Sequence, residues 1–183
     1  MIKSNFNCFH GTIMDTIDLI LRSKEFRSQK RDNHWLGNGV YFFIDDPLSA
    51  HIWPTLHKVN HGKKTCIIFC EVGVPRDRLL DLDTEADLKL FEDYLEGIKE
   101  HYRVEIIGAT DARIRCFVMD TLPVKGQKNA IDAIKYTFVK NPRVNKDYSL
   151  SVEMNIQAHG PQLCVRNQEC INKDSLKNYE YTC

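Results

Sequence analysis

The chain has 183 residues, of which 43% are hydrophobic and 27% charged, and its formal net charge is zero. A chain of this length can bury a sufficient core, so we expect a single domain over residues 1–183. The neutral balance excludes any argument for a nucleic-acid partner from overall charge. Seven cysteines without a repeated spacing argue against a disulfide scaffold, and no apolar run is long enough for a signal peptide or a membrane span. These features predict a cytoplasmic, unprocessed protein with reduced thiols.

The first third of the chain is expected to hold two strands and two helices. Residues 5–9 form the first predicted strand, and a Thr-x-x-Asp capping box that begins at Thr12 predicts a helix after it. Residues 39–44, GVYFFI, are β-branched and aromatic and predict the second strand. A short helix is expected to begin near Pro47 and to stop near Pro54.

The remaining elements are expected to alternate irregularly. Residues 65–74 are the most strand-like stretch and predict a central strand. Residues 84–98 predict a second amphipathic helix, which begins with another Thr-x-x-Asp capping box at Thr84. Further strands are predicted over 115–119 and 162–166, with a helix over 129–140. Strands scattered among helices without regular βαβ spacing favour an α+β fold.

Charge is spread unevenly along the chain. Residues 77–96 are rich in Asp and Glu, whereas residues 22–31 and 125–146 are rich in Lys and Arg. Such runs are typical of solvated faces, and a surface for nucleic acid or another partner is the alternative interpretation.

A metal site is the first candidate for chemistry. His57, His61, Cys66 and Cys70 have a spacing that superficially resembles zinc ligation. Cys66 and Cys70 lie within one predicted strand, however, so they are about 13 Å apart and too distant to share an ion. We therefore expect no metal.

Two further candidates are weak. Cys8 and His10 lie on one face of a predicted strand, but no third group is positioned to activate a thiol nucleophile, and a buried cysteine is the ordinary interpretation. Asp45 and Asp46 are adjacent in sequence, so their carboxylates point to opposite faces of a strand and make a poor pair for acid–base catalysis.

The strongest candidate joins two short motifs, His10-Gly11-Thr12 and Gly39-Val40-Tyr41. A histidine at a strand end, followed by glycine, can present an imidazole beside unobstructed backbone. A tyrosine on a second strand can stack on a flat ring through its face. Taken singly, His10 could be an ordinary strand-end histidine and Tyr41 an ordinary half-buried aromatic.

Three segments together resemble a known family. FHGT at residues 9–12, ILRSKEF at 20–26 and WLGNGVYFFIDDPLSA at 35–50 are similar to the ADP-ribosyltransferase domain of the poly(ADP-ribose) polymerase and diphtheria-toxin branch. The resemblance covers residues 6–53 and extends to 160–171. It implies a split β-sheet with peripheral helices, and NAD as the substrate.

The resemblance also implies a role for individual residues. His10 would hydrogen-bond a ribose hydroxyl of NAD, and Gly11 would hold the nicotinamide carboxamide through its backbone. Tyr41 would pack on the nicotinamide ring, Ser49 would donate a hydrogen bond to the carboxamide, and Ala50 would keep the pocket floor shallow. The implied NAD-binding residues are His10, Gly11, Thr12, Gly39, Tyr41, Ser49 and Ala50. Small residues at 37 and 39 would let the chain turn and let NAD approach the backbone.

The main departure from the family is Gln162, which stands in GPQLCVRNQECI where the family has a catalytic Glu. Its amide oxygen can accept a hydrogen bond from a ribose hydroxyl, but it carries no charge and cannot act as a base. Glu169 and Glu153 are the alternative carboxylates. A second departure is Ile52, which replaces a stacking tyrosine, with Trp53 beside it.

The expected activity is therefore mono-ADP-ribosylation of a macromolecular acceptor, either RNA or DNA or a protein. The family selects its acceptor through the loop before the late strand, here about 145–161. A compact chain of this kind resembles bacterial toxins and antiviral defence effectors, which implies a neutralising antitoxin partner. A catalytically silent NAD-binding module and an NAD glycohydrolase remain the alternatives.

Overall fold

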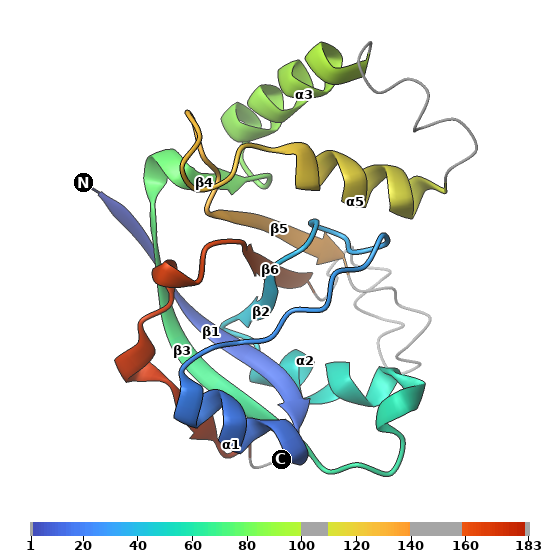
Figure 1. The fold of residues 1–183 in the computed structure, drawn as a ribbon, viewed down its shortest axis with the longest axis vertical. Helices are drawn as coiled ribbons and strands as arrows, with labels where there is room; N and C mark the ends of the chain where they lie inside the picture. The colour runs from blue at the N-terminus through green and yellow to red at the C-terminus, as the bar shows by residue number, and fades with distance from the viewer. Residues whose placement is uncertain (1, 100–109, 140–158, 182–183) are drawn as a thin grey trace, which may run out of the picture.

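Two long antiparallel strands form the spine of the molecule in a computed structural model that describes residues 2–99, 110–139 and 159–181 (Figure 1). The strands are β1 (Lys3–Ile13), β2 (Val40–Ile44), β3 (Thr65–Pro75), β4 (Leu79–Asp81), β5 (Ala133–Val139), β6 (His159–Val165) and β7 (Lys177–Tyr179). The helices are α1 (Met14–Ser23), α2 (Pro47–Ile52), α3 (Glu85–Lys99) and α5 (Asp111–Thr121), with short 3₁₀ turns at Trp53–Leu56, Lys58–Asn60, Arg76–Arg78, Gln168–Cys170 and Lys173–Ser175. The expected α+β class is confirmed.

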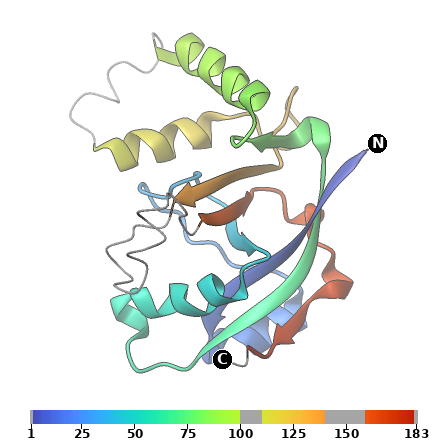
Figure 2. The same ribbon diagram turned by 180° about the vertical axis from the view of Figure 1, so that it is seen from behind.

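The described strands form one mixed sheet in the order β4-β5-β6-β2-β1-β3-β7. Helices α3 and α5 lie at the end of the sheet that holds β4 and β5, whereas α1 and α2 lie at the other end (Figures 1 and 2). Within the described residues, none of the helices has the length and apolar character that crossing a bilayer requires.

Strand β1 is paired very differently along its two edges. With β3 it makes an antiparallel ladder from Lys3↔Pro75 to Ile13↔Thr65. With β2 it pairs only at Cys8↔Ile44 and Phe9↔Phe43. The sheet is therefore split beyond Phe9, where β2 continues beside β6 and β1 continues beside β3.

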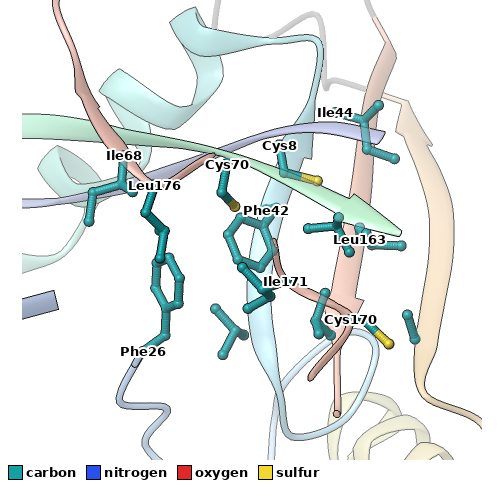
Figure 3. Close-up of a cluster of buried hydrophobic side chains, with 14 of the residues drawn as sticks. Cys8, Phe26, Phe42, Ile44, Ile68, Cys70, Leu163, Cys170, Ile171 and Leu176 are labelled. Carbon is teal, nitrogen blue, oxygen red and sulfur yellow. The ribbon is translucent and has the colours of Figure 1, made fainter. Parts of the chain in front are cut away.

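The core lies on both faces of this sheet. Phe42 and Cys8 are buried on the face covered by α1 and by the C-terminal segment, where Phe26, Ile171 and Leu176 pack (Figure 3). Phe43 and Phe9 lie on the opposite face, with Ala50 of α2. Because side chains alternate along a strand, these two sets fix which face each neighbouring residue occupies.

Two predicted elements are wrong in type. Residues 115–119 belong to helix α5, whose N-cap Thr110 accepts a hydrogen bond from the backbone N–H of Arg113 at 3.4 Å. Its buried side chains Cys116 and Met119 are three apart, which is helical spacing. A five-residue apolar run cannot distinguish a strand from a buried helix segment.

The predicted helix over 129–140 is instead strand β5, which pairs with β6 from Ala133↔Val165 to Val139↔His159. The sequence from Ile134 to Val139 is rich in β-branched and aromatic residues, which favour a strand. The backbone hydrogen bonds with β6 stabilise the strand more than the weak helical periodicity of this segment stabilises a helix.

The two predicted capping boxes have different outcomes. Thr84 accepts a hydrogen bond from the Asp87 backbone N–H at 3.3 Å, as expected at the start of α3. At α1 the prediction is wrong, because β1 continues to Ile13, and Ile13 is the N-cap without a side-chain hydrogen bond. Pro47 does open α2, and the helix passes into a 3₁₀ turn at Trp53.

Candidate functional site

A cavity of about 460 Å³ lies where β1 and β2 part. It is lined by His10, Arg27, Ser28, Gln29, Arg31, His34, Trp35, Gly39, Val40, Tyr41, Trp53, His57, Phe138 and Gln162. The lining combines strand residues with the segment between α1 and β2 and with the 3₁₀ turn after α2. A volume of this size is typical of sites for small organic ligands.

His10 is held in one tautomer at the split. Its Nδ1 lies 2.9 Å from the carbonyl oxygen of Tyr41, so Nδ1 carries the hydrogen and donates it. Its ring packs edge-on against Phe26 and Phe42, at centroid distances of 5.1 and 5.7 Å. Burial lowers the pKa of His10 below its ordinary value, which favours the neutral ring. Nε2 is then left as a hydrogen-bond acceptor.

Tyr41 uses its hydroxyl for the fold. The phenol oxygen accepts a hydrogen bond from the backbone N–H of Leu36 and donates one to the carbonyl of Gly37, both at 2.8 Å. Burial raises the pKa of Tyr41 far above its ordinary value, so the phenol cannot act as an acid or base near neutrality. What Tyr41 can offer a ligand is its ring, which His34 meets edge-on at 5.5 Å.

His10 and Tyr41 belong to opposite faces of the sheet. Cys8 and Phe42 are buried on one face, and side chains alternate along a strand. His10, two residues after Cys8, therefore lies on that face, whereas Tyr41, one residue before Phe42, lies on the other. Both nevertheless line the same cavity. They meet because the strands that carry them are no longer paired at this point, so the space between β1 and β2 is open to both faces.

Gln162 reaches the same cavity from β6, where it pairs with Phe43 of β2 and Tyr136 of β5. Among the described residues its side-chain amide has no hydrogen-bond partner, so its oxygen and nitrogen remain available to a ligand. The three residues predicted to be catalytic therefore lie around one cavity.

The glycines near the cavity each have a steric reason. Gly37 has φ +76°, a left-handed conformation that turns the chain into β2. A Cβ on Gly39 would lie 2.6 Å from Sγ of Cys164, so this glycine lets β6 approach closely. A Cβ on Gly11 would lie 1.8 Å from the carbonyl oxygen of Ala50, so Gly11 admits helix α2. The expected turn at Gly37 is confirmed. At Gly11 and Gly39, the atoms that a side chain would meet belong to other parts of the protein and not to a ligand.

Four of the predicted NAD-binding residues lie outside the lining: Gly11, Thr12, Ser49 and Ala50. Ser49 donates its backbone N–H and its hydroxyl to the Asp46 carboxylate, at 2.9 and 2.5 Å, which caps α2. Thr12 lies 2.6 Å from the Thr16 hydroxyl, which itself donates to the Ile13 carbonyl. Both hydroxyls therefore serve helix starts, and Ala50 is fully buried against Gly11.

The alternative carboxylates do not replace Gln162 in the described structure. Glu169 is an exposed residue whose carboxylate pairs with Lys125 at 2.5 Å, and it does not line the cavity. The Lys125 ammonium lowers the pKa of Glu169. Glu169 therefore lies apart from the cavity that holds His10, Tyr41 and Gln162. Glu153 lies outside the described residues, as does most of the expected acceptor loop 145–161.

Most of the cationic and aromatic wall of the cavity is not predicted from the sequence. Arg27 and Arg31 come from the basic run at 22–31, for which a solvated face is the expected interpretation and a surface for nucleic acid or another partner is the alternative. Trp35 and Phe138 were not expected to contribute, whereas Trp53, considered as a substitute for a tyrosine at position 52, does line the cavity. No Asp or Glu contributes to the lining within the described part of the chain, so the site has a cationic and aromatic character.

The other candidate chemistries find no support in the geometry. Cys66 and Cys70 both lie in β3 as expected, and the described residues contain no group of three or more His, Cys, Asp or Glu suited to a metal ion. Cys8 is fully buried, and burial raises the pKa of its thiol well above the ordinary value. A thiol in that environment is not a nucleophile.

No protein-family profile matches the chain. Among curated proteins it is similar to the uncharacterized protein MJ0359 of Methanocaldococcus jannaschii, with 26% identity over 199 aligned positions that cover 95% of this chain and 88% of that protein. No solved structure matches significantly. The similarity spans nearly the whole of both chains but names no activity, so function has to be inferred from the site.

Proposed function

We propose that the chain is a mono-ADP-ribosyltransferase that cleaves NAD and transfers ADP-ribose to a macromolecular acceptor. The observation that carries this proposal is that His10, Tyr41 and Gln162, from three different strands, line one cavity. At His10 and Tyr41 the sequence resembles the catalytic motif of the poly(ADP-ribose) polymerase and diphtheria-toxin branch, and Gln162 stands where that motif has Glu. A chance similarity of short motifs would give no reason for such distant segments to converge.

The character of the cavity supports a dinucleotide substrate. NAD presents flat heterocycles and a negatively charged diphosphate. Tyr41 and Trp53 provide aromatic surface, and Arg27 and Arg31 provide two positive charges at the same cavity. The lack of lining carboxylates among the described residues avoids repulsion of the diphosphate.

The chemistry follows from how charge develops. Breaking the bond between nicotinamide and ribose leaves positive charge on the ribose, so the enzyme must orient the leaving group and hold the ribose hydroxyls. Neutral His10 can accept from one hydroxyl through Nε2, and Gln162 can accept from another through its amide oxygen. An uncharged amide stabilises the positive ribose less than a carboxylate does. This favours a single transfer to an acceptor that is already nucleophilic over polymer elongation.

The decisive experiment is incubation of the protein with NAD labelled in its adenylate phosphate, in a cell lysate treated separately with nuclease and with protease. We expect the label to enter a macromolecule, and His10→Ala to abolish transfer. The exposed His61 lies outside the cavity, so His61→Ala is the matched control. If Gln162→Ala leaves the rate within about twofold, less than roughly half a kcal/mol of barrier, its proposed role is wrong.

Gln162 also favours a second candidate, a silent NAD-binding module, because the residue lacks the charge that the family uses. Binding of NAD without release of nicotinamide would support that candidate. Release of free ADP-ribose without transfer would instead identify an NAD glycohydrolase, in which water is the acceptor.

A further inference from the structure

Three aromatic rings form a continuous strip that runs from the cavity wall to the surface beside it. Trp35 and Tyr136 each meet Phe138 edge-on, at a centroid distance of 4.8 Å. The two outer rings are well exposed, at 52% for Trp35 and 38% for Tyr136. We call Trp35, Phe138 and Tyr136 the aromatic strip. Exposed aromatic side chains that touch one another offer a surface on which flat rings of a ligand can stack.

The strip begins at the catalytic position. Tyr136 of β5 stands directly opposite Gln162 in the β5–β6 ladder, so the two side chains share a face of the sheet. Phe138 is two residues further along β5, on that same face, and lines the cavity together with Trp35. A chain lying on the strip would therefore lead directly to Gln162.

Positive charge accompanies the strip. The guanidinium of Arg115, on α5, lies 4.6 Å above the Trp35 ring, and its buried Nε has no hydrogen-bond partner among the described residues. Arg27 and Arg31 line the cavity and are assigned to the diphosphate of NAD, so Arg115 is the arginine at the strip itself. The nearby Arg113 is paired with Asp32 at 2.6 Å, which neutralises that carboxylate.

We infer that the acceptor of ADP-ribose is a single-stranded nucleic acid whose unpaired bases stack on the aromatic strip. This inference depends on the proposed function, and it specifies the acceptor. Stacking on aromatic rings combined with arginine contacts to the phosphates is the general way in which proteins hold single strands. A duplex keeps its bases stacked on one another and cannot use the strip.

The transfer of ADP-ribose to a base nitrogen or a phosphate oxygen needs no general base among the described residues of the site. The bond from ribose C1 to the nicotinamide nitrogen breaks, and nicotinamide leaves with the electron pair. A lone pair on a base nitrogen or a phosphate oxygen of the single strand then bonds to C1. Where the attacking nitrogen carries a hydrogen, that proton is released to water after the bond has formed.

Binding without NAD tests the inference independently of the proposed function. Fluorescein-labelled 12-nucleotide single-stranded RNA, single-stranded DNA and the matching DNA duplex are titrated with the full chain, and fluorescence anisotropy is recorded at several salt concentrations. We expect one or both single strands to bind more tightly than the duplex, with an affinity that falls as salt rises. The two single-strand arms distinguish RNA from DNA.

Two variants locate the binding surface. Tyr136→Ala and Trp35→Ala should each weaken single-strand binding roughly fivefold or more, as expected for the loss of one stacking ring. Tyr181, which stacks on His51 outside the strip, provides the matched control, and Tyr181→Ala should bind like the wild type. Thermal melting of each variant checks that it is folded.

The outcomes are distinct. Equal or tighter binding of the duplex, unchanged binding by both strip variants, or no binding of any oligonucleotide overturns the inference, as does labelling of protein alone in the lysate. Turnover of NAD without oligonucleotide binding overturns the inference and leaves the proposed function standing. Binding of single strands without NAD turnover instead removes the proposed function.

Discussion

Strand β1 has one closed edge and one open edge. Along the closed edge it pairs with β3 over its whole length, from Lys3 to Ile13. Along the open edge it pairs with β2 at only two positions, Cys8 and Phe9, and the cavity lies where this pairing ends. The difference teaches that a single strand can stabilise the fold along one edge and leave room for a cavity, the candidate site, along the other.

The open edge is held apart by specific contacts. Helix α2 packs closely on Gly11, and the imidazole of His10 donates to the Tyr41 carbonyl where a backbone partner would otherwise be expected. The closed edge is an ordinary ladder flanked by buried side chains such as Val72. Substitutions at the two edges should therefore affect stability and activity differently.

The largest effect is expected for Gly11→Ala. The new Cβ would lie 1.8 Å from the carbonyl oxygen of Ala50 and 2.9 Å from Cδ of Pro54, so helix α2 must move. We expect a loss of about 3 kcal/mol or more in the free energy of unfolding, measured by urea denaturation. The control is Gly97→Ala in α3, where a Cβ meets nothing within 4 Å and alanine should stabilise the helix. Equal stabilities for the two variants would contradict the close contact.

The next effect is expected at the closed edge. Val72→Ala removes two methyl groups from a side chain that is 1% exposed, which should cost roughly 2 kcal/mol of stability. Because Val72 lies away from the cavity, the rate of NAD turnover per folded molecule should not change. A large loss of turnover at full folding would show that the two edges are coupled.

Tyr41→Phe tests the open edge with a smaller change. It keeps the ring but removes the hydroxyl that bonds the backbone of Leu36 and Gly37. We expect a loss of about 1–2 kcal/mol, because these backbone groups lose their partner. Isothermal titration with NAD should still detect binding through the ring, whereas Tyr41→Ala should abolish it. Loss of NAD binding in Tyr41→Phe as well would contradict the prediction that the ring alone is sufficient.

The smallest effect concerns pH. Burial lowers the pKa of His10 from its ordinary value of 6.5, so the unfolded chain takes up the proton first as the pH falls. Stability should therefore decrease as the pH falls below about 6.5, down to the pKa of the folded state. His10→Gln removes this contribution, and its unfolding free energy should depend less steeply on pH between 7 and 5. An identical dependence would mean that His10 is not buried as a neutral ring.

The sequence predicted the strands and helices that have a strong local pattern. The apolar run of β3 and the glycine-bounded strand β2 were both expected, as were Pro47 at the start of α2 and Thr84 before α3. Two elements have the opposite type to the one predicted: β5 was expected to be a helix and the α5 segment a strand. In both, the apolar run is short, so packing against neighbouring elements determines the secondary structure. No local signal indicates that β5 pairs along β6.

The candidate site was predictable only in part. His10, Tyr41 and Gln162 were expected to lie in one site, and all three line one cavity. Their relative positions follow from the pairing of β1, β2 and β6 in the sheet. Arg27 and Phe138 could not be placed, since one lies in an irregular segment and the other in a strand that was predicted as a helix. Ser49 was expected to face the ligand, but its hydroxyl bonds the neighbouring Asp46, a competition that sequence spacing does not reveal.

Asn38 connects the cavity wall to a distant helix. It donates its backbone N–H and its side-chain amide to Asp120 of α5, at 2.7 and 2.5 Å, and accepts the Arg31 backbone N–H at 2.9 Å. These hydrogen bonds tie the irregular wall to α5 without any ligand, so a molecule that bound there would have less of the wall to immobilise. If the cavity binds NAD as proposed, its affinity depends in part on α5, and Asp120, which is not in the lining, is a position from which natural variation can adjust that affinity.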